Sequence, residues 1–199
     1  MVLALVVLIW TARQQRAPAP LARAAAAEAP FASGGSGGTP PDLSTMSPRE
    51  RFDRLYRRVM QAAERGDTAT VARFSPMAFM AYGQLDSADA DARYHAAVLH
   101  LHVRGDTAAA LRLADTILAA APHHLFGYLI RGTAARLAGN APLLERAYAD
   151  FLAAWDGEMR AARPEYRDHE AMLKQFHEAA VEGRKEGKSE GRKDRRSDG

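Results

Sequence analysis

The chain has 199 residues, no cysteine and a formal net charge of +3 at pH 7. The absence of cysteine excludes a disulfide framework, a thiolate zinc site and a cysteine nucleophile. Residues 183–199 hold seven basic and four acidic side chains and account for the whole net charge. The remainder is near neutral and lacks the basic face expected of a nucleic-acid-binding domain.

Residues 1–10 form an uncharged apolar run, MVLALVVLIW. A membrane-spanning helix needs about 20 apolar residues, whereas the core of a signal peptide needs only about 7–15. Two interpretations remain open, a short signal segment or part of an anchor helix that begins upstream, and the anchor is the favoured one. It predicts a membrane-associated, single-pass protein and leaves the side of the membrane open.

Residues 11–46 are rich in alanine, proline, glycine and serine, a composition that predicts a disordered linker. The stretch GGSGG at 34–38 formally matches the G-x-S-x-G nucleophile elbow. That motif supports chemistry only on a strand-to-helix turn. Neither a strand pattern nor a helix pattern flanks it here, so no catalytic serine is expected.

The folded part is predicted to begin at Ser47. This residue suits a helix N-cap, Pro48 suits the first helical position, and Glu50 completes a capping box. From residue 47 to 182 apolar residues recur three and four apart, which predicts an all-α domain. Residues 164–182 are expected to form a C-terminal capping helix. Residues 183–199 contain no large apolar residue and are expected to be a disordered charged tail.

A recurring dipeptide divides this domain. Gly66-Asp67, Gly105-Asp106 and Gly139-Asn140 each lie between two amphipathic stretches. The glycine can take the left-handed conformation that ends one helix, and the Asp or Asn can cap the next. The glycines are 39 and then 34 residues apart, and 34 is the period of the tetratricopeptide repeat.

The segment 47–155 therefore resembles a tetratricopeptide repeat protein with two to three degenerate repeats. Within 91–124 and 125–156, the residues that fall on the family pattern are Tyr94, Leu101, Gly105, Ala110, Pro122, Tyr128, Gly132, Gly139 and Tyr148. Leu144 and Phe151 replace expected alanines, so the last helix pair is expected to pack more loosely or at another angle. In 52–85 only the glycine turn is convincing. The resemblance implies a short right-handed α-solenoid of antiparallel helix hairpins.

In this family the first helices of successive repeats line a groove that holds a peptide. The resemblance places the partner-binding groove at Tyr56, Met60, His95, Leu99, His102, Leu129, Thr133 and Arg136. Such a surface suits an extended peptide, with Arg136 available to a carboxylate. The open alternative is that these side chains pack against the N-terminal segment or the terminal helix. The arginines of the first helix, Arg49 among them, are expected mainly to form a solvated face.

No metal, cofactor or catalytic residue is expected. His95 and His102 are seven residues apart, whereas metal-binding histidine pairs on a helix are usually three or four apart. Asp91 precedes His95 by four residues, but this pair does not supply three ligands. His169-Glu170 begins like the zinc-protease helix motif but lacks the second histidine. The histidines, including His124 in an interrepeat turn, are expected on the surface or in the groove.

These observations predict a non-enzymatic, membrane-tethered scaffold of a bacterial-type envelope that binds an unidentified protein or peptide partner. The membrane contact is assigned to the N-terminal segment, and the oligomeric state is left open. The alternative is binding to an anionic surface or nucleic acid through the basic C-terminal tail, although nucleic acid is the less favoured ligand because acidic residues dilute the tail's charge.

Overall fold

The computed structural model describes residues 46–197, with side chains described as far as residue 185. Within this part of the chain all regular elements are helical and no strand occurs, which confirms the all-α prediction. The elements are α2 (Pro48–Glu64), α3 (Thr68–Gly83), α4 (Ala90–Leu99), the π-helical turn η2 (His100–Arg104), α5 (Thr107–Ala120), α6 (Leu125–Leu137), α7 (Ala141–Ala161), the 3-10 turn η3 (Pro164–Tyr166) and α8 (Glu170–Ser197).

Helix α2 begins as the sequence predicts. The Ser47 hydroxyl accepts a hydrogen bond from the Glu50 amide at 3.3 Å, and the Glu50 carboxylate accepts one from the Ser47 amide at 2.9 Å. Pro48 occupies the first turn, where its missing N–H has no helical partner to lose. This reciprocal capping box fixes the boundary of the helical domain.

The three predicted hinges all separate two helices. Gly66, Gly105 and Gly139 take left-handed φ angles of 70°, 65° and 65°. The Asp or Asn that follows each glycine caps the next helix by accepting a hydrogen bond from an amide three residues on. A Cβ at these glycines would meet no atom within 4 Å, so backbone conformation, not space, favours glycine there. The hinge prediction is confirmed.

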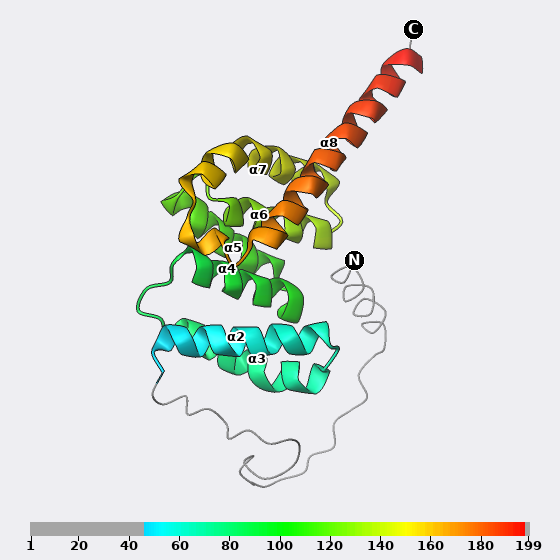
Figure 1. The fold of residues 1–199 in the computed structure, drawn as a ribbon. Coiled ribbons are helices and arrows are strands. Elements are labelled where there is room, and N and C mark those ends of the chain that lie inside the picture. The colour runs from blue at the N-terminus through cyan, green and yellow to red at the C-terminus, as the bar shows by residue number, and fades with distance from the viewer. Residues whose placement is uncertain (1–45, 198–199) are drawn as a thin grey trace, which may run out of the picture.

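The hinges join the helices into three antiparallel hairpins, α2–α3, α4–α5 and α6–α7 (Figure 1). Helix α4 packs against both helices of the first hairpin and against α6, so the second hairpin lies between the other two. One apolar cluster around Phe52 and Leu99 joins the first two hairpins. A second cluster, which includes Phe126, Phe151 and Phe176, joins the second and third hairpins to α8.

The π-helical turn η2 forms the end of the first helix of the second hairpin. It follows α4 directly, and the Asp106 amide closes it by donating to the His100 carbonyl at 2.9 Å. A π turn holds one more residue than an α turn. Together with the loop between α3 and α4, it accommodates the longer interval between the first two hinge glycines.

Helix α8 packs on α6 and α7, as expected of a capping helix. Leu173 and Phe176 are buried, and a Cβ on Gly132 of α6 would lie 2.4 Å from the Phe176 ring. The buried Phe151 also meets this ring, with 4.8 Å between centroids, so the bulky residue at an expected alanine position serves the contact with α8.

The tail from residue 183 differs from the prediction of disorder, because α8 continues as helix to Ser197 and extends beyond the body of the hairpins (Figure 1). A helix that is already nucleated and anchored at its start adds further turns at little cost. The segment also contains no proline, and Glu182 and Lys185 form an ion pair of 3.0 Å along it. The disorder expected of this tail is therefore not confirmed.

The single-pass membrane localisation expected from the sequence is not supported. Among the described helices, none combines the length and the apolar character needed to cross a bilayer. The apolar run 1–10, on which that expectation depended, and the linker 11–45 lie outside the described residues.

Candidate functional site

The residues assigned to a groove divide into a buried group and an accessible one. Leu99 is completely buried in the first apolar cluster, and Leu129, 3 % exposed, lies in the second. His95 is only 9 % exposed, and its ring stacks on Tyr56 with 3.9 Å between centroids. At these positions the groove implied by the family resemblance is closed.

Tyr56, Met60, His102 and Thr133 are half-buried, and Arg136 is the one exposed residue of the set. Burial lowers the pKa of His102, and the positive charge of Arg136 lowers it further. This end of the groove stays a prediction for partner binding.

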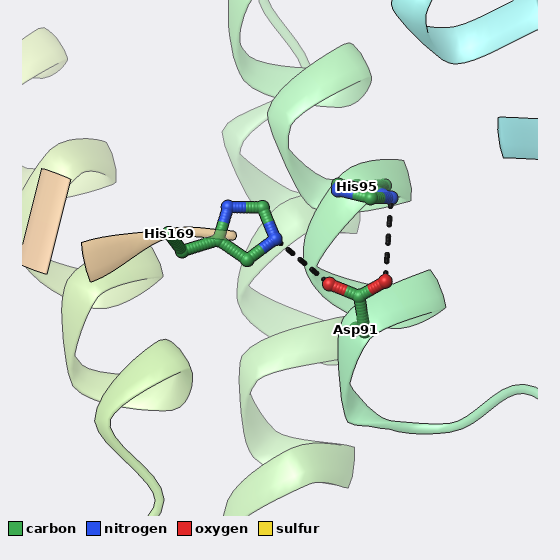
Figure 2. Close-up of side chains that lie close together, drawn as sticks. All are labelled: Asp91, His95 and His169. Carbon is green, nitrogen blue, oxygen red and sulfur yellow. Dashed lines mark hydrogen bonds and ion pairs between the residues drawn. The ribbon is translucent and has the colours of Figure 1, made fainter. Parts of the chain in front are cut away.

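A different constellation gathers beside α4 (Figure 2). Asp91 and His95 lie one turn apart on that helix, and His169 reaches them from the turn before α8. The His169 Nε2 atom is 2.8 Å from Asp91 Oδ1, and the His95 Nδ1 atom is 3.7 Å from Asp91 Oδ2. One nitrogen or oxygen from each of the three side chains lies within 4.8 Å of the others.

The aromatic surroundings hold both imidazoles in place. Tyr56 of α2 covers one face of the His95 ring, and the His169 ring meets His95 edge-on, with 5.1 Å between centroids. Tyr94 and Phe126 also lie within 5.1 Å of the His169 ring, again edge to face. Burial raises the pKa of Tyr56 and of Tyr94, so both phenols stay protonated and neither supplies a phenolate.

Two buried polar atoms in this region lack hydrogen-bond partners. They are His95 Nδ1 and Asp53 Oδ1, which lie 3.7 Å apart. That separation is too long for a hydrogen bond. Since buried polar atoms are nearly always satisfied in folded proteins, an orphaned pair that faces the Asp91 carboxylate requires an explanation.

Arg49 holds the carboxylates in position. Its guanidinium binds Asp53 Oδ2 at 2.8 Å, Asp89 Oδ1 at 2.6 Å and Asp91 Oδ2 at 2.5 Å. Burial opposes ionisation of Asp53 and Asp91, but the contacts with Arg49 and the histidines outweigh it and lower both pKa values. Both are therefore carboxylates at neutral pH. The expectation that Arg49 belongs to a solvated face is wrong.

A second cluster, built around His124, lies beneath the segment 163–169, which also supplies His169. His124 is 1 % exposed, and its Nδ1 accepts from the Phe126 amide at 3.3 Å while its Nε2 lies 3.1 Å from Glu165 Oε1. The Tyr166 hydroxyl donates to Glu158 at 2.7 Å and accepts from the Leu125 amide at 2.9 Å. The surface position expected for His124 is wrong, because η3 covers it.

We call Asp91, His95 and His169, with Asp53 and Arg49 beside them, the Asp91 cluster. The spacing of residues in the sequence draws attention only to Asp91 and His95. His169 is 78 residues from Asp91, and Arg49 is 42 residues from it. The partial zinc-protease pattern draws attention to His169, but that pattern predicts a second histidine ligand on the same helix. The partners that the fold supplies come instead from α4.

Comparison of the chain with protein-family models, with curated proteins and with solved structures finds no match. The resemblance to tetratricopeptide repeats consequently stays a prediction.

Proposed function

We propose that the protein is a binding scaffold of the tetratricopeptide type, a short right-handed α-solenoid that recruits a protein partner and is capped by α8. The repeated turn supports this proposal, because the same left-handed glycine and capping Asp or Asn closes all three hairpins. Hairpins of this kind stack into elongated surfaces suited to binding other proteins.

The observation that carries the binding role is the outward face of α3. This helix, TATVARFSPMAFMAYG, contains no acidic residue and a single basic one, Arg73. Met80 on this helix is 63 % exposed, whereas Phe74 and Met77 are half-buried and pack against the first apolar cluster beside it. A surface helix normally presents charged side chains to water, so an exposed methionine on a helix with so few charges favours a docking site.

Arginines border this face and indicate the chemistry of the partner. The Arg58 guanidinium lies 4.1 Å from the centroid of the Phe74 ring, and Arg104 lies 3.6 Å from that of Phe79. Methionine, aromatic residues and arginine are the types enriched at the centres of protein interfaces. The surface suits an amphipathic helix with carboxylates beside its apolar stripe, which the arginines can bind.

Site-specific photo-crosslinking in cells tests this function. A photoreactive residue replaces Met80 in the full-length chain, and the matched control replaces Leu143, a 54 % exposed apolar residue on α7. A discrete adduct with another polypeptide at position 80 alone supports the proposal. Purified, that polypeptide should bind the wild type, bind Leu143→Glu equally and bind Met80→Glu at least tenfold more weakly.

A third position, Arg136, tests the accessible end of the groove. An adduct at 136 and none at 80 would keep the scaffold function but move its surface to the groove. An adduct of the chain with itself would make α3 a dimer interface, and absence of an adduct at all three positions would contradict the function. Binding through the C-terminal tail stays a prediction, because the side chains beyond residue 185 lie outside the described part.

A further inference from the structure

The Asp91 cluster has the composition and spacing of a metal site. Its nitrogen and oxygen donors come from Asp91, His95 and His169, and Asp53 of α2 lies next to them, with its Oδ1 atom 3.7 Å from His95 Nδ1. Imidazole and carboxylate together suit zinc and similar divalent transition ions, whereas magnesium and calcium prefer oxygen ligands alone. We propose that these four side chains bind one divalent ion of the zinc class.

The distances agree with this assignment. Ligands about 2.1 Å from an ion in tetrahedral geometry are about 3.4 Å from one another. The His95 Nδ1 atom lies 3.7 Å from Asp53 Oδ1 and 3.7 Å from Asp91 Oδ2, and His169 Nε2 lies 2.8 Å from Asp91 Oδ1. The ligand atoms of Asp91, His95 and His169 thus lie within 4.8 Å of one another, and Asp53 Oδ1 lies beside one of them, His95 Nδ1.

The orphaned atoms give the independent indication of a ligand. His95 is about nine-tenths buried, and its Nδ1 points between two carboxylates without a hydrogen bond to either. Asp53 Oδ1 likewise has no hydrogen bond and lies 3.7 Å from that nitrogen. An ion between His95 Nδ1 and Asp53 Oδ1 would give each atom a partner. None of the described side chains donates or accepts a hydrogen bond at either atom.

The charges in the cluster also match a divalent cation. Asp53, Asp89 and Asp91 oppose the single guanidinium of Arg49, so with neutral imidazoles the net charge is −2. Arg49 binds the Oδ2 atoms of Asp53 and Asp91 and leaves an Oδ1 atom on each directed toward a histidine. It therefore takes the role of an outer-shell residue that orients ligating carboxylates.

The ligand count indicates a structural role. Four protein ligands complete the tetrahedral coordination of zinc and leave no position for a substrate. The ligands come from α2, α4 and the turn before α8, so the ion would tie the first hairpin and the capping helix to the second hairpin. The inference is independent of partner binding by α3.

The test uses the full-length protein stripped with a chelator and titrated with Zn²⁺ by calorimetry and with Co²⁺ by visible absorption. We expect one equivalent of each ion to bind, with the intense visible bands of four-coordinate cobalt. His95→Gln and His169→Ala should each weaken binding at least 100-fold, and Asp53→Asn about tenfold. His177→Ala removes a histidine that packs on Trp155 outside the cluster and should bind like the wild type.

Thermal unfolding followed by circular dichroism supplies the second measurement. Zinc should raise the melting temperature of the wild type and of His177→Ala, because it binds only the folded state, but not that of His95→Gln. Helical spectra of the metal-free variants show that each one folds. The proposal is overturned if the wild type binds no ion, or if His95→Gln and His169→Ala bind as tightly as the wild type.

Discussion

Two histidines lie beneath the segment 163–169, and they differ in how their ring nitrogens are used. Around His124 that segment completes a closed network, in which both ring nitrogens have partners and Glu158 binds both Arg163 and Tyr166. Around His95 the same segment supplies His169 yet leaves Nδ1 without a hydrogen bond. One cluster is thus satisfied by the chain itself, and the other is incomplete without a further group.

The buried imidazoles of His124 and His95 therefore suit different roles, one structural and one in binding. A buried network with all its donors and acceptors paired stabilises a fold and has nothing left to offer a ligand. A buried nitrogen that makes no hydrogen bond keeps its lone pair or proton for a further group. Burial alone does not distinguish the two cases, since His124 and His95 are 1 % and 9 % exposed.

The largest expected difference comes from removing one polar atom of each cluster in the metal-free protein. Tyr166→Phe deletes the acceptor of the Leu125 amide and a donor to Glu158, and should lower the free energy of unfolding by about 2–4 kcal/mol. His95→Phe breaks no hydrogen bond of Nδ1 and keeps a ring against Tyr56, so it should change stability by no more than about 1 kcal/mol.

Urea unfolding in the presence of chelator measures both variants under the same conditions. Equal losses would mean that His95 makes a strong interaction in the metal-free protein, and the distinction between the clusters would then fail. A cost for Tyr166→Phe below about 1 kcal/mol would show that water replaces the phenol in the closed network.

A smaller effect is expected from displacing α8, which positions His169. In Gly132→Ala the new methyl group would lie 2.4 Å from the Phe176 ring, and overpacking of this kind costs about 1–3 kcal/mol. Gly157→Ala on α7 is the matched control, because its Cβ meets no atom within 4 Å. It should raise stability by about 0.5–1 kcal/mol through the higher helix propensity of alanine.

Thermal or urea unfolding ranks the two alanine variants. If Gly132→Ala is as stable as Gly157→Ala, α8 moves at no cost, and the position of His169 is then not fixed by packing. A destabilised Gly132→Ala with weaker zinc binding would instead link the packing of α8 to the completeness of the Asp91 cluster.

The features that the sequence predicts correctly are local ones. The capping box at Ser47 and the three glycine hinges depend on residues no more than four positions apart, so their partners can be identified in the chain itself. The apolar spacing of the helices likewise gives the all-α class. Each of these features needs only the geometry of one helix and its ends.

The features that the sequence misses depend on contacts between distant segments. His124 follows Pro122 in a polar turn, and nothing nearby indicates that η3, whose Glu165 is 41 residues later in the chain, will bury it. The closure of the groove at Leu99 and Leu129 depends in the same way on how the hairpins pack. Composition also does not indicate that α8 continues as helix through residues 183–197, which follow directly on its packed start.

The smallest expected effect concerns the pH dependence of the closed network. Burial is the main reason that the pKa of His124 is lowered, and Arg163 adds to the effect while Glu165 and Glu158 oppose it. The unfolded chain, with an ordinary histidine pKa of about 6.5, binds a proton first as the pH falls. Stability from this group is therefore complete above about pH 6.5 and is lost as the pH falls toward the lower pKa of the folded state.

His124→Asn removes the titrating ring and keeps a side chain that suits an N-cap. Between pH 7.5 and 5.5, with chelator present, the wild type should lose up to about 1.4 kcal/mol more stability than this variant. The pKa values of His100 and His102 are also lowered, so the variant should keep part of the pH dependence. Equal losses in the two proteins would mean that the closed network accepts a proton on His124 without cost, which its complete hydrogen bonding and burial argue against.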